Sequence, residues 1–144
     1  MIEQALIIGR PAGMEQLIGE LLAHSRSARF FARMQDLSTD LEVAPALVLI
    51  CQHWPEEYTT AQVQALLSRY PLARMICCYG PWCASDGRTR NIWPAAVRVP
   101  LAHAGDRLRR ELMVIAGKCP PLPLTAGLDE IFDFDHGETE SSAV

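Results

Sequence analysis

Thiol, imidazole and carboxylate side chains cluster at the ends of two apolar stretches of this sequence. Cys51 ends the run 46–51 and His53 follows it, while Cys78 lies in the run 74–79, ahead of Cys83 and Asp86. If both runs are neighbouring parallel strands, these side chains meet at the carboxyl edge of a sheet, where α/β proteins build their sites. The chemistry open to such a set is a metal ion held by Cys51, His53, Cys78 and Cys83, or a Cys51 nucleophile beside His53.

The cysteine spacing also has a simpler interpretation. Zinc sites usually contain C-x₂₋₄-C pairs, and Cys78-x₄-Cys83 fits that pattern only loosely, with no second pair in the chain. Cysteine is among the most frequently buried residue types, so Cys51, Cys77 and Cys78 are expected to fill the core. We therefore expect no metal centre. A thiol- or metal-dependent enzyme or sensor that uses Cys51 and the loop after 74–79 remains an alternative.

The loop at 9–13 follows the first apolar run, at the place where nucleotide-binding folds hold phosphate groups. It contains neither G-x-G-x-x-G nor a P-loop lysine, and Pro11 removes a backbone donor. We therefore expect no cofactor.

Aromatic and arginine side chains concentrate after the third and fourth apolar runs, and all three tryptophans belong to this set. Such residues are enriched at binding surfaces, which suggests a small-molecule binder at this end of the sheet. Alternatively, the rings cap the core and Asp86 pairs with a nearby arginine. The candidate binding residues are His53, Trp54, Tyr58, Trp82, Asp86, Arg88, Arg90 and Trp93.

The elements that must position these residues follow a repeating strand–helix pattern. The apolar runs predict strands at 4–9, 28–34, 46–51, 74–79 and 96–99, and apolar stripes predict helices at 14–24, 59–70 and 102–116, with a short helix possible within 35–42. Thr59 and Gln62 have capping-box spacing. The pattern favours one α/β domain over 1–117, a doubly wound five-stranded parallel sheet of flavodoxin-like type with strand order 2-1-3-4-5.

Two local motifs resemble the receiver domain of response regulators, the CheY-like family. The segment 46–55, ALVLICQHWP, is similar to the receiver strand that ends in the phosphoacceptor aspartate and is followed by a proline. The segment 97–101, VRVPL, is similar to the receiver strand in which a lysine precedes a proline. The likeness spans about residues 4–116.

The resemblance implies that every residue needed for phosphoryl transfer is replaced. The acidic pair falls on Gly9 and Arg10, the phosphoacceptor on Cys51, the switch hydroxyl on Tyr79 and the lysine on Val99. Phosphoryl transfer needs Mg²⁺ held by carboxylates, and these strand ends have none.

The implied function is that of a non-catalytic pseudo-receiver, not phosphorylated on aspartate, which acts through protein–protein contact in bacterial two-component signal transduction. A homodimer through the face built from 74–79, 96–99 and 102–116, which receivers commonly use, is one arrangement that the resemblance implies.

Charge and hydropathy exclude some classes of binding partner. Residues 1–117 hold 12 Arg and 11 Asp or Glu, so no broad phosphate-binding surface is expected and nucleic acid is a poor candidate partner. The apolar stretch 5–8 is too short to span a bilayer or to act as a signal segment, which favours a cytoplasmic location without membrane contact. Residues 118–144 read as a Pro-rich and then acidic tail, with apolar 128–134 able to dock and disorder expected from His136.

Overall fold

Five parallel strands form one sheet in the computed structural model, which describes residues 1–37, 44–54, 57–80 and 92–136. The strands pair in the order β2-β1-β3-β4-β5, so the chain has the α/β flavodoxin-like fold that the sequence predicts. β3 is buried along its whole length, as a continuous apolar run predicts for a central strand. The strand bounds are β1 Ile2–Ile8, β2 Ser25–Phe31, β3 Leu47–Gln52, β4 Arg74–Tyr79 and β5 Arg98–Pro100.

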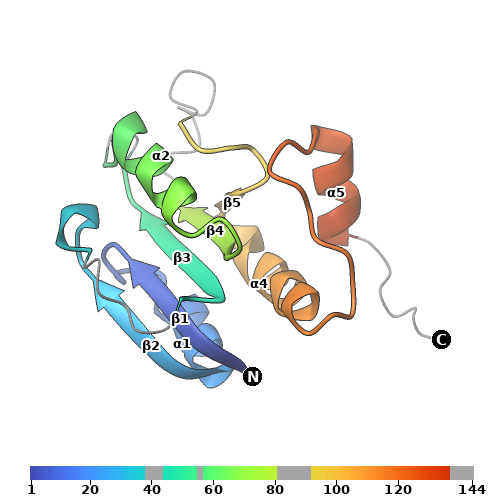
Figure 1. Ribbon diagram of the computed structural model, residues 1–144, viewed down its shortest axis with the longest axis horizontal. Helices are drawn as coiled ribbons and strands as arrows, with labels where there is room; N and C mark the ends of the chain where they lie inside the picture. Colours follow the sequence, from blue (N-terminus) through green and yellow to red (C-terminus); the bar gives the residue numbers. More distant parts are fainter. Residues whose placement is uncertain (38–43, 55–56, 81–91, 137–144) are drawn as a thin grey trace.

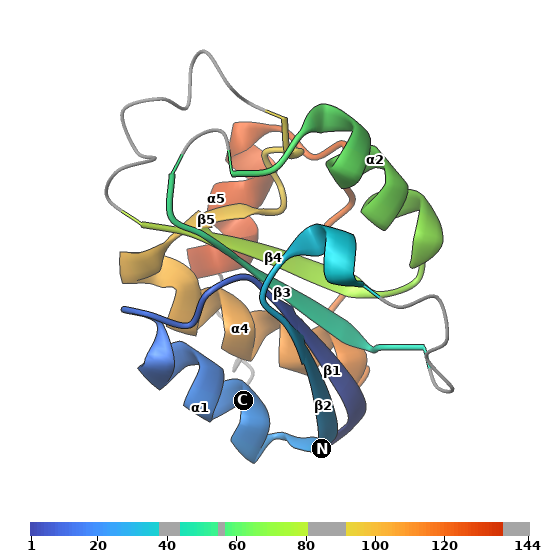
Figure 2. The same ribbon diagram turned by 90° about the vertical axis from the view of Figure 1, so that its left-hand side faces the viewer.

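Helices cover the two faces of this sheet unequally. Figure 2 shows α1 and α4 on one face and α2 on the other, with the short 3₁₀ turn η1 on the α2 side. The helix bounds are α1 Glu15–Ala23, α2 Thr60–Arg69, α4 Leu101–Ile115, α5 Leu128–His136 and η1 Met34–Asp36. The expected capping box is confirmed: Gln62 donates its backbone N–H to Thr59 Oγ1 at 3.1 Å, and Thr59 donates its own to Gln62 Oε1 at 3.0 Å.

The bounds of four strands differ from the sequence prediction, those of β1 and β3 by only one or two residues. β2 spans Ser25–Phe31 and not 28–34, because α1 ends at Ala23 and the chain enters the sheet almost at once. β2 is an edge strand, so its first residues are polar and gave no apolar signal. β5 is only Arg98–Pro100 and not 96–99, so it starts two residues later than predicted and includes Pro100. Pro100 faces Tyr79 in the register, a placement that proline tolerates at a strand near the sheet edge. A short helix was expected within 35–42; the 3₁₀ turn η1, Met34–Asp36, overlaps the start of that range, and residues 38–42 lie outside the described residues.

The chain after α4 turns back along the domain. Figure 1 places α5 beside α4 and β5, on the side of the sheet opposite to β2. Phe134 and Ala126 join Leu122 and Ala96 in a small separate core, against which Val114 of α4 packs. Among the described residues, no helix is long and apolar enough to cross a membrane.

Candidate functional site

The carboxyl ends of β1 and β3 lie side by side at the point where the strand order reverses. Ligands of open α/β sheets bind outside the strands at such a switch point. Gly9 and Arg10 leave the sheet from β1, and His53 and Trp54 leave it from β3. This edge is therefore where a site of this fold would be assembled, and it contains four of the residues singled out from sequence.

A tyrosine seals the inner part of this edge. Tyr58 is 4% exposed and donates its hydroxyl to the backbone carbonyl of Cys51 at 2.8 Å. Gly9 fits against both groups: it has a φ of +107°, and a Cβ added there would lie 2.4 Å from the Cys51 oxygen and 2.7 Å from the Tyr58 hydroxyl. A side chain at position 9 is thus excluded by conformation and by space. A carboxylate could not occupy this position without rebuilding the edge.

The sealed thiol is protected from ionisation as well as from solvent. Cys51 has no exposed surface, and its strand partner Cys78 is buried too. Burial raises the pKa of the Cys51 thiol to about 12, with a smaller contribution from Cys78. Burial likewise raises the pKa of Cys78 to about 12. At neutral pH both groups are thiols, whereas nucleophilic catalysis and metal binding need the thiolate.

His53 takes part in the loop structure at the edge and not in a dyad with Cys51. Its Nε2 donates to the carbonyl oxygen of Arg10 at 2.7 Å, and its backbone N–H donates to Glu57 at 2.7 Å. Among the described residues, no hydrogen bond joins His53 to the Cys51 thiol, and no three metal-binding side chains come together. Cys83 lies outside the described residues.

A shallow crevice remains open beside the seal. The Arg10 guanidinium lies 5.4 Å from the centre of the Trp54 ring, which is 42% exposed. Arg33, from the chain after β2, lines the same crevice and pairs with Asp36 at 3.0 Å. The crevice measures about 180 Å³ and is lined by Arg10, Ala32, Arg33, Met34, Gln35, Trp54, Glu57 and Tyr58. The lining also contains the Glu57 carboxylate, and Arg33 is paired with Asp36, so a small anion would be held mainly by Arg10 beside the Trp54 ring.

Trp93 belongs to the core, in line with the capping interpretation. It is 2% exposed, packs edge-on against Tyr58 and donates its indole N–H to Gln52 Oε1 at 3.0 Å. The same Gln52 oxygen accepts the Cys77 thiol, and the Gln52 amide donates to the Trp54 carbonyl. Sequence reasoning missed Gln52. A glutamine at the end of an all-apolar strand was the available signal, because a buried amide needs several partners.

The remaining sequence candidates are only partly described. Val99 is buried in the same core as Cys51 and Cys78, and Tyr79 is half-buried with the Arg98 guanidinium 4.2 Å from its ring centre. Neither side chain has a contact that suggests a role in phosphoryl transfer. The other candidates, Trp82, Asp86, Arg88 and Arg90, lie outside the described residues.

A second polar cluster, not expected from sequence, holds the C-terminal segment to α4. Arg107 is 1% exposed; it forks onto Asp135 of α5 at 2.5 and 3.0 Å and donates to the Ala96 carbonyl at 2.5 Å. Its guanidinium also lies 5.4 Å from the Phe134 ring centre.

The second ion pair of this region joins Arg74 of β4 to buried Glu111 of α4, at 2.5 and 3.2 Å. Arg74 also donates to the Leu122 carbonyl. On the outer side of α4, Asp106 pairs with Arg109 at 2.7 Å. The face used by receiver dimers in the sequence-based expectation is therefore lined, in this chain, by its own residues 122–135.

Known proteins offer no further guide to this edge or to the α5 contact. Neither protein-family models, nor curated proteins, nor solved structures yield a match to this chain.

Proposed function

We propose that the chain is a non-catalytic, receiver-like domain that works by binding another protein. The observation that carries this proposal is the seal formed by Tyr58, Cys51 and Gly9 at the strand ends. In the resemblance, Cys51 stands at the phosphoacceptor position and Gly9 at a metal-binding position. The proposal places the domain in cytoplasmic signal transduction of the bacterial two-component type, the setting in which receiver domains work.

Phosphoryl transfer has three physical requirements, and the described edge fits none of them. The reaction needs an exposed acceptor oxygen, carboxylates for Mg²⁺ and an open path for the phosphodonor. Cys51 is fully buried, position 9 has no room for a side chain, and Arg10 brings a positive charge in place of a metal-binding carboxylate. A domain of this fold that lacks the reaction retains its surfaces, and binding is the function those surfaces support.

The test of this proposal combines a phosphodonor with thiol labelling. The protein is incubated with acetyl phosphate and Mg²⁺ beside a working receiver as positive control, and intact mass is measured. We expect no adduct on this chain, and a stoichiometric phospho-adduct would refute the proposal.

Iodoacetamide labelling then tests the thiol alternative on the native protein. Cys119 is partly exposed and should be labelled, whereas Cys51 and Cys78 should be labelled only in urea. Rapid labelling of Cys51 in the native state would favour a thiol enzyme or sensor instead.

A second candidate function is supported by the open crevice. Arg10, Arg33 and Trp54 line a volume of about 180 Å³, below the range of about 300–1,000 Å³ typical of sites for drug-sized ligands. A nucleotide is too large, so the candidate ligand is a small phosphate or carboxylate. Titration with inorganic phosphate or citrate should quench tryptophan fluorescence in the native chain and not in Trp54→Phe. Equal quenching in both proteins would remove this candidate.

A further inference from the structure

The two edges of the sheet differ in how they are protected. β5 has three residues, and the C-terminal segment packs beside it through Phe134 and the Arg107–Asp135 pair. β2 is the outermost strand at the other side, and it has seven residues (Figure 1). In the described part of the chain, no strand pairs with the outer side of β2. Proteins usually shorten or cover such an edge, because its free N–H and C=O groups pair readily with another strand.

Backbone groups of β2 face outward at regular positions. The Phe31 carbonyl accepts the Gly9 N–H at 2.8 Å, so Phe31 faces β1. Because backbone direction alternates along a strand, Arg29 also faces β1, while Ala28 and Phe30 direct their N–H and C=O groups away from the sheet. These outward groups are the ones that an added strand would bond.

The exposed side chains of β2 give this edge a positive charge. Arg26 is 66% exposed and lies 3.5 Å from Glu3, while Arg29 is exposed and lies over the Phe31 ring. Among the described residues, Arg29 has no acidic partner. Phe30 is 53% exposed, which adds an apolar contact next to the two charges. The edge therefore combines free hydrogen-bonding groups, two cations three residues apart and one exposed ring.

We infer that β2 binds an acidic peptide in extended conformation, which joins the sheet as a sixth strand. Strand addition supplies main-chain hydrogen bonds, and the side chains beside the edge select the sequence. A peptide with acidic residues three apart faces Arg26 and Arg29, and an apolar residue next to the second acid contacts Phe30. The inference rests on the proposed function, because it names the partner chemistry of a protein-binding domain.

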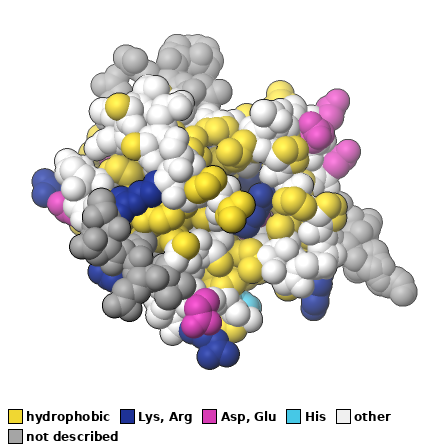
Figure 3. All heavy atoms as spheres, viewed as in Figure 1, with side chains coloured by type: hydrophobic (Ala, Val, Ile, Leu, Met, Phe, Trp, Pro, Cys, Tyr) yellow, Lys and Arg dark blue, Asp and Glu magenta, His cyan; other side chains and the backbone are white. Residues whose placement is uncertain are grey.

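Charge decides between this occupant and a second copy of the chain. Two copies paired through β2 would bring four arginine side chains into one two-stranded junction, and like charges across strands are destabilising. Glu3 of β1 lies 3.5 Å from Arg26, so one of the two arginines has an acidic neighbour within the molecule. The exposed acidic residues of α5 lie on the other side of the sheet from β2: acidic side chains gather at the upper right of Figure 3, where Figure 1 places α5. Arg29, which has no acidic partner among the described residues, is thus available to a separate acidic chain, and the exposed Arg26–Glu3 pair can exchange its partner for one.

The experiment uses the full chain and two capped peptides. The probe is TEVTEFT, and the matched control TKVTKFT differs only in the sign of its two charges. Binding is followed by ¹H–¹⁵N NMR at low and high salt. We expect TEVTEFT to bind at least about tenfold more tightly than TKVTKFT, with the difference reduced by salt. The amide signals of Ala28 and Phe30 should shift more than that of Arg29, which faces β1.

Two variants test the role of charge without relying on loss of binding alone. Arg26→Glu/Arg29→Glu should reverse the preference and bind TKVTKFT more tightly, a gain that a misfolded protein could not show. Asp129→Lys, a change of charge at an exposed position of α5 on the side of the sheet opposite to β2, should keep the original preference.

Three results would overturn the inference. The first is equal binding of the two peptides, and the second is a set of amide chemical-shift changes centred on Trp54 and the crevice instead of β2. The third is a dimer in sedimentation velocity that the Arg26→Glu/Arg29→Glu substitution abolishes, because the occupant of β2 would then be a second copy of the chain. The phosphodonor experiment does not involve β2. Failure of peptide binding without a phospho-adduct therefore contradicts this inference and leaves the proposed function standing.

Discussion

The contact between α5 and α4 is held by a buried charge, and Asp135→Asn should release it. Arg107 is 1% exposed, and its partner Asp135 is 20% exposed at the side chain. Removing one charge of a fully buried pair costs about 3–5 kcal/mol. After the change, the Ala96 carbonyl still accepts one Arg107 N–H, and residue 135 remains partly solvated. We therefore expect the contact between α5 and α4 to lose about 2–3 kcal/mol of stability.

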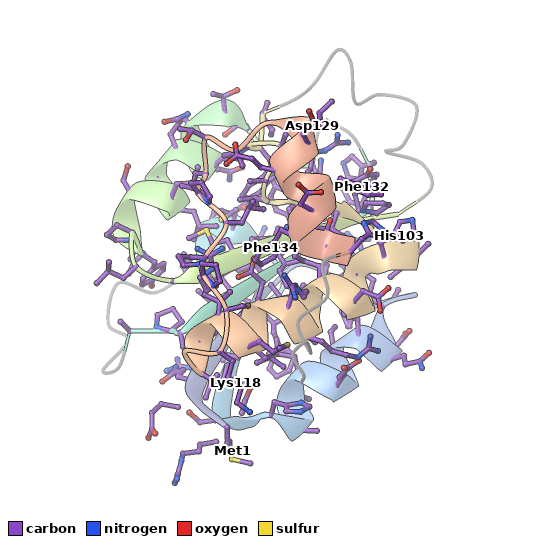
Figure 4. The ribbon with its side chains drawn as sticks, turned by 90° about the vertical axis from the view of Figure 1, so that its right-hand side faces the viewer. Met1, His103, Lys118, Asp129, Phe132 and Phe134 are labelled. Carbon is purple, nitrogen blue, oxygen red and sulfur yellow. The ribbon has the colours of Figure 1, made fainter. Side chains whose placement is uncertain are left out.

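This loss should open α5 locally and leave the five-stranded sheet folded. The apolar surface that α5 buries is small: in Figure 4, Phe134 and Phe132 lie on different sides of the helix, and only Phe134 is buried, while Phe132 is 61% exposed. Hydrogen exchange followed by mass spectrometry measures the effect directly. A loss of 2 kcal/mol corresponds to exchange about 30-fold faster in the amides of α5, with β1 and β3 unchanged.

Two comparisons give this prediction its controls. Asp133→Asn makes the same chemical change at an exposed position of the same helix and should leave exchange near the wild-type rate. The double variant Arg107→Met/Asp135→Leu replaces the pair by apolar side chains and should recover most of the protection, because no charge is then left buried. If Asp135→Asn and Asp133→Asn exchange equally, the Arg107 pair does not hold α5 and the reasoning is wrong.

Further predictions concern the sealed edge and the helix cap. Gly9→Ala should lower the free energy of unfolding by about 3 kcal/mol or more, because its Cβ would meet backbone at a positive φ; urea unfolding beside Gly127→Ala, which has open space, checks this. The pKa values of the Cys51 and Cys78 thiols are raised by burial to about 12, so the folded chain keeps protons that the unfolded chain loses near pH 9. The free energy of unfolding should not depend on these thiols below pH 9. Between pH 9 and 12 it should fall by up to about 1.4 kcal/mol per pH unit for each thiol. Urea unfolding at a series of pH values measures this fall, which should be smaller in a Cys51→Ala/Cys78→Ala protein. Thr59→Ala should cost about 1 kcal/mol in thermal unfolding through loss of the α2 cap, and an unchanged Tm would contradict the capping assignment.

The sequence predicted where in the fold the candidate site lies, but it did not predict the contacts that its side chains make. Strand ends could be placed from sequence, and the structure brings Gly9, Arg10, Cys51 and His53 together at the carboxyl edge of the sheet. The Tyr58 seal could not be seen, because it depends on a hydroxyl reaching the carbonyl of a residue seven positions earlier across a turn.

Buried ion pairs were the larger omission. The Arg107–Asp135 pair joins residues 28 apart, and the Arg74–Glu111 pair joins residues 37 apart. Neither spacing has a local periodicity, whereas the capping box at Thr59 is a contact within one helical turn and was predicted correctly. Local rules find contacts made by neighbours in sequence, and charges buried between distant elements follow no such rule.

The sequence by itself determined the order of the five strands and of α1, α2 and α4, because apolar runs of strand length and apolar stripes of helical spacing record which surfaces must leave water. It did not predict α5, which lies in the segment expected to be a tail. It also determined that no carboxylate stands at the strand ends, since this depends only on residue type. Tertiary structure alone decided that the thiol at position 51 is sealed and held neutral and that residues 122–135 pack beside β5. It also decided that, in the part of the chain that the structure describes, no strand pairs with the outer side of β2, which presents two exposed arginines. These properties arise from burial and from contacts between distant segments, and both exist only once the chain has folded.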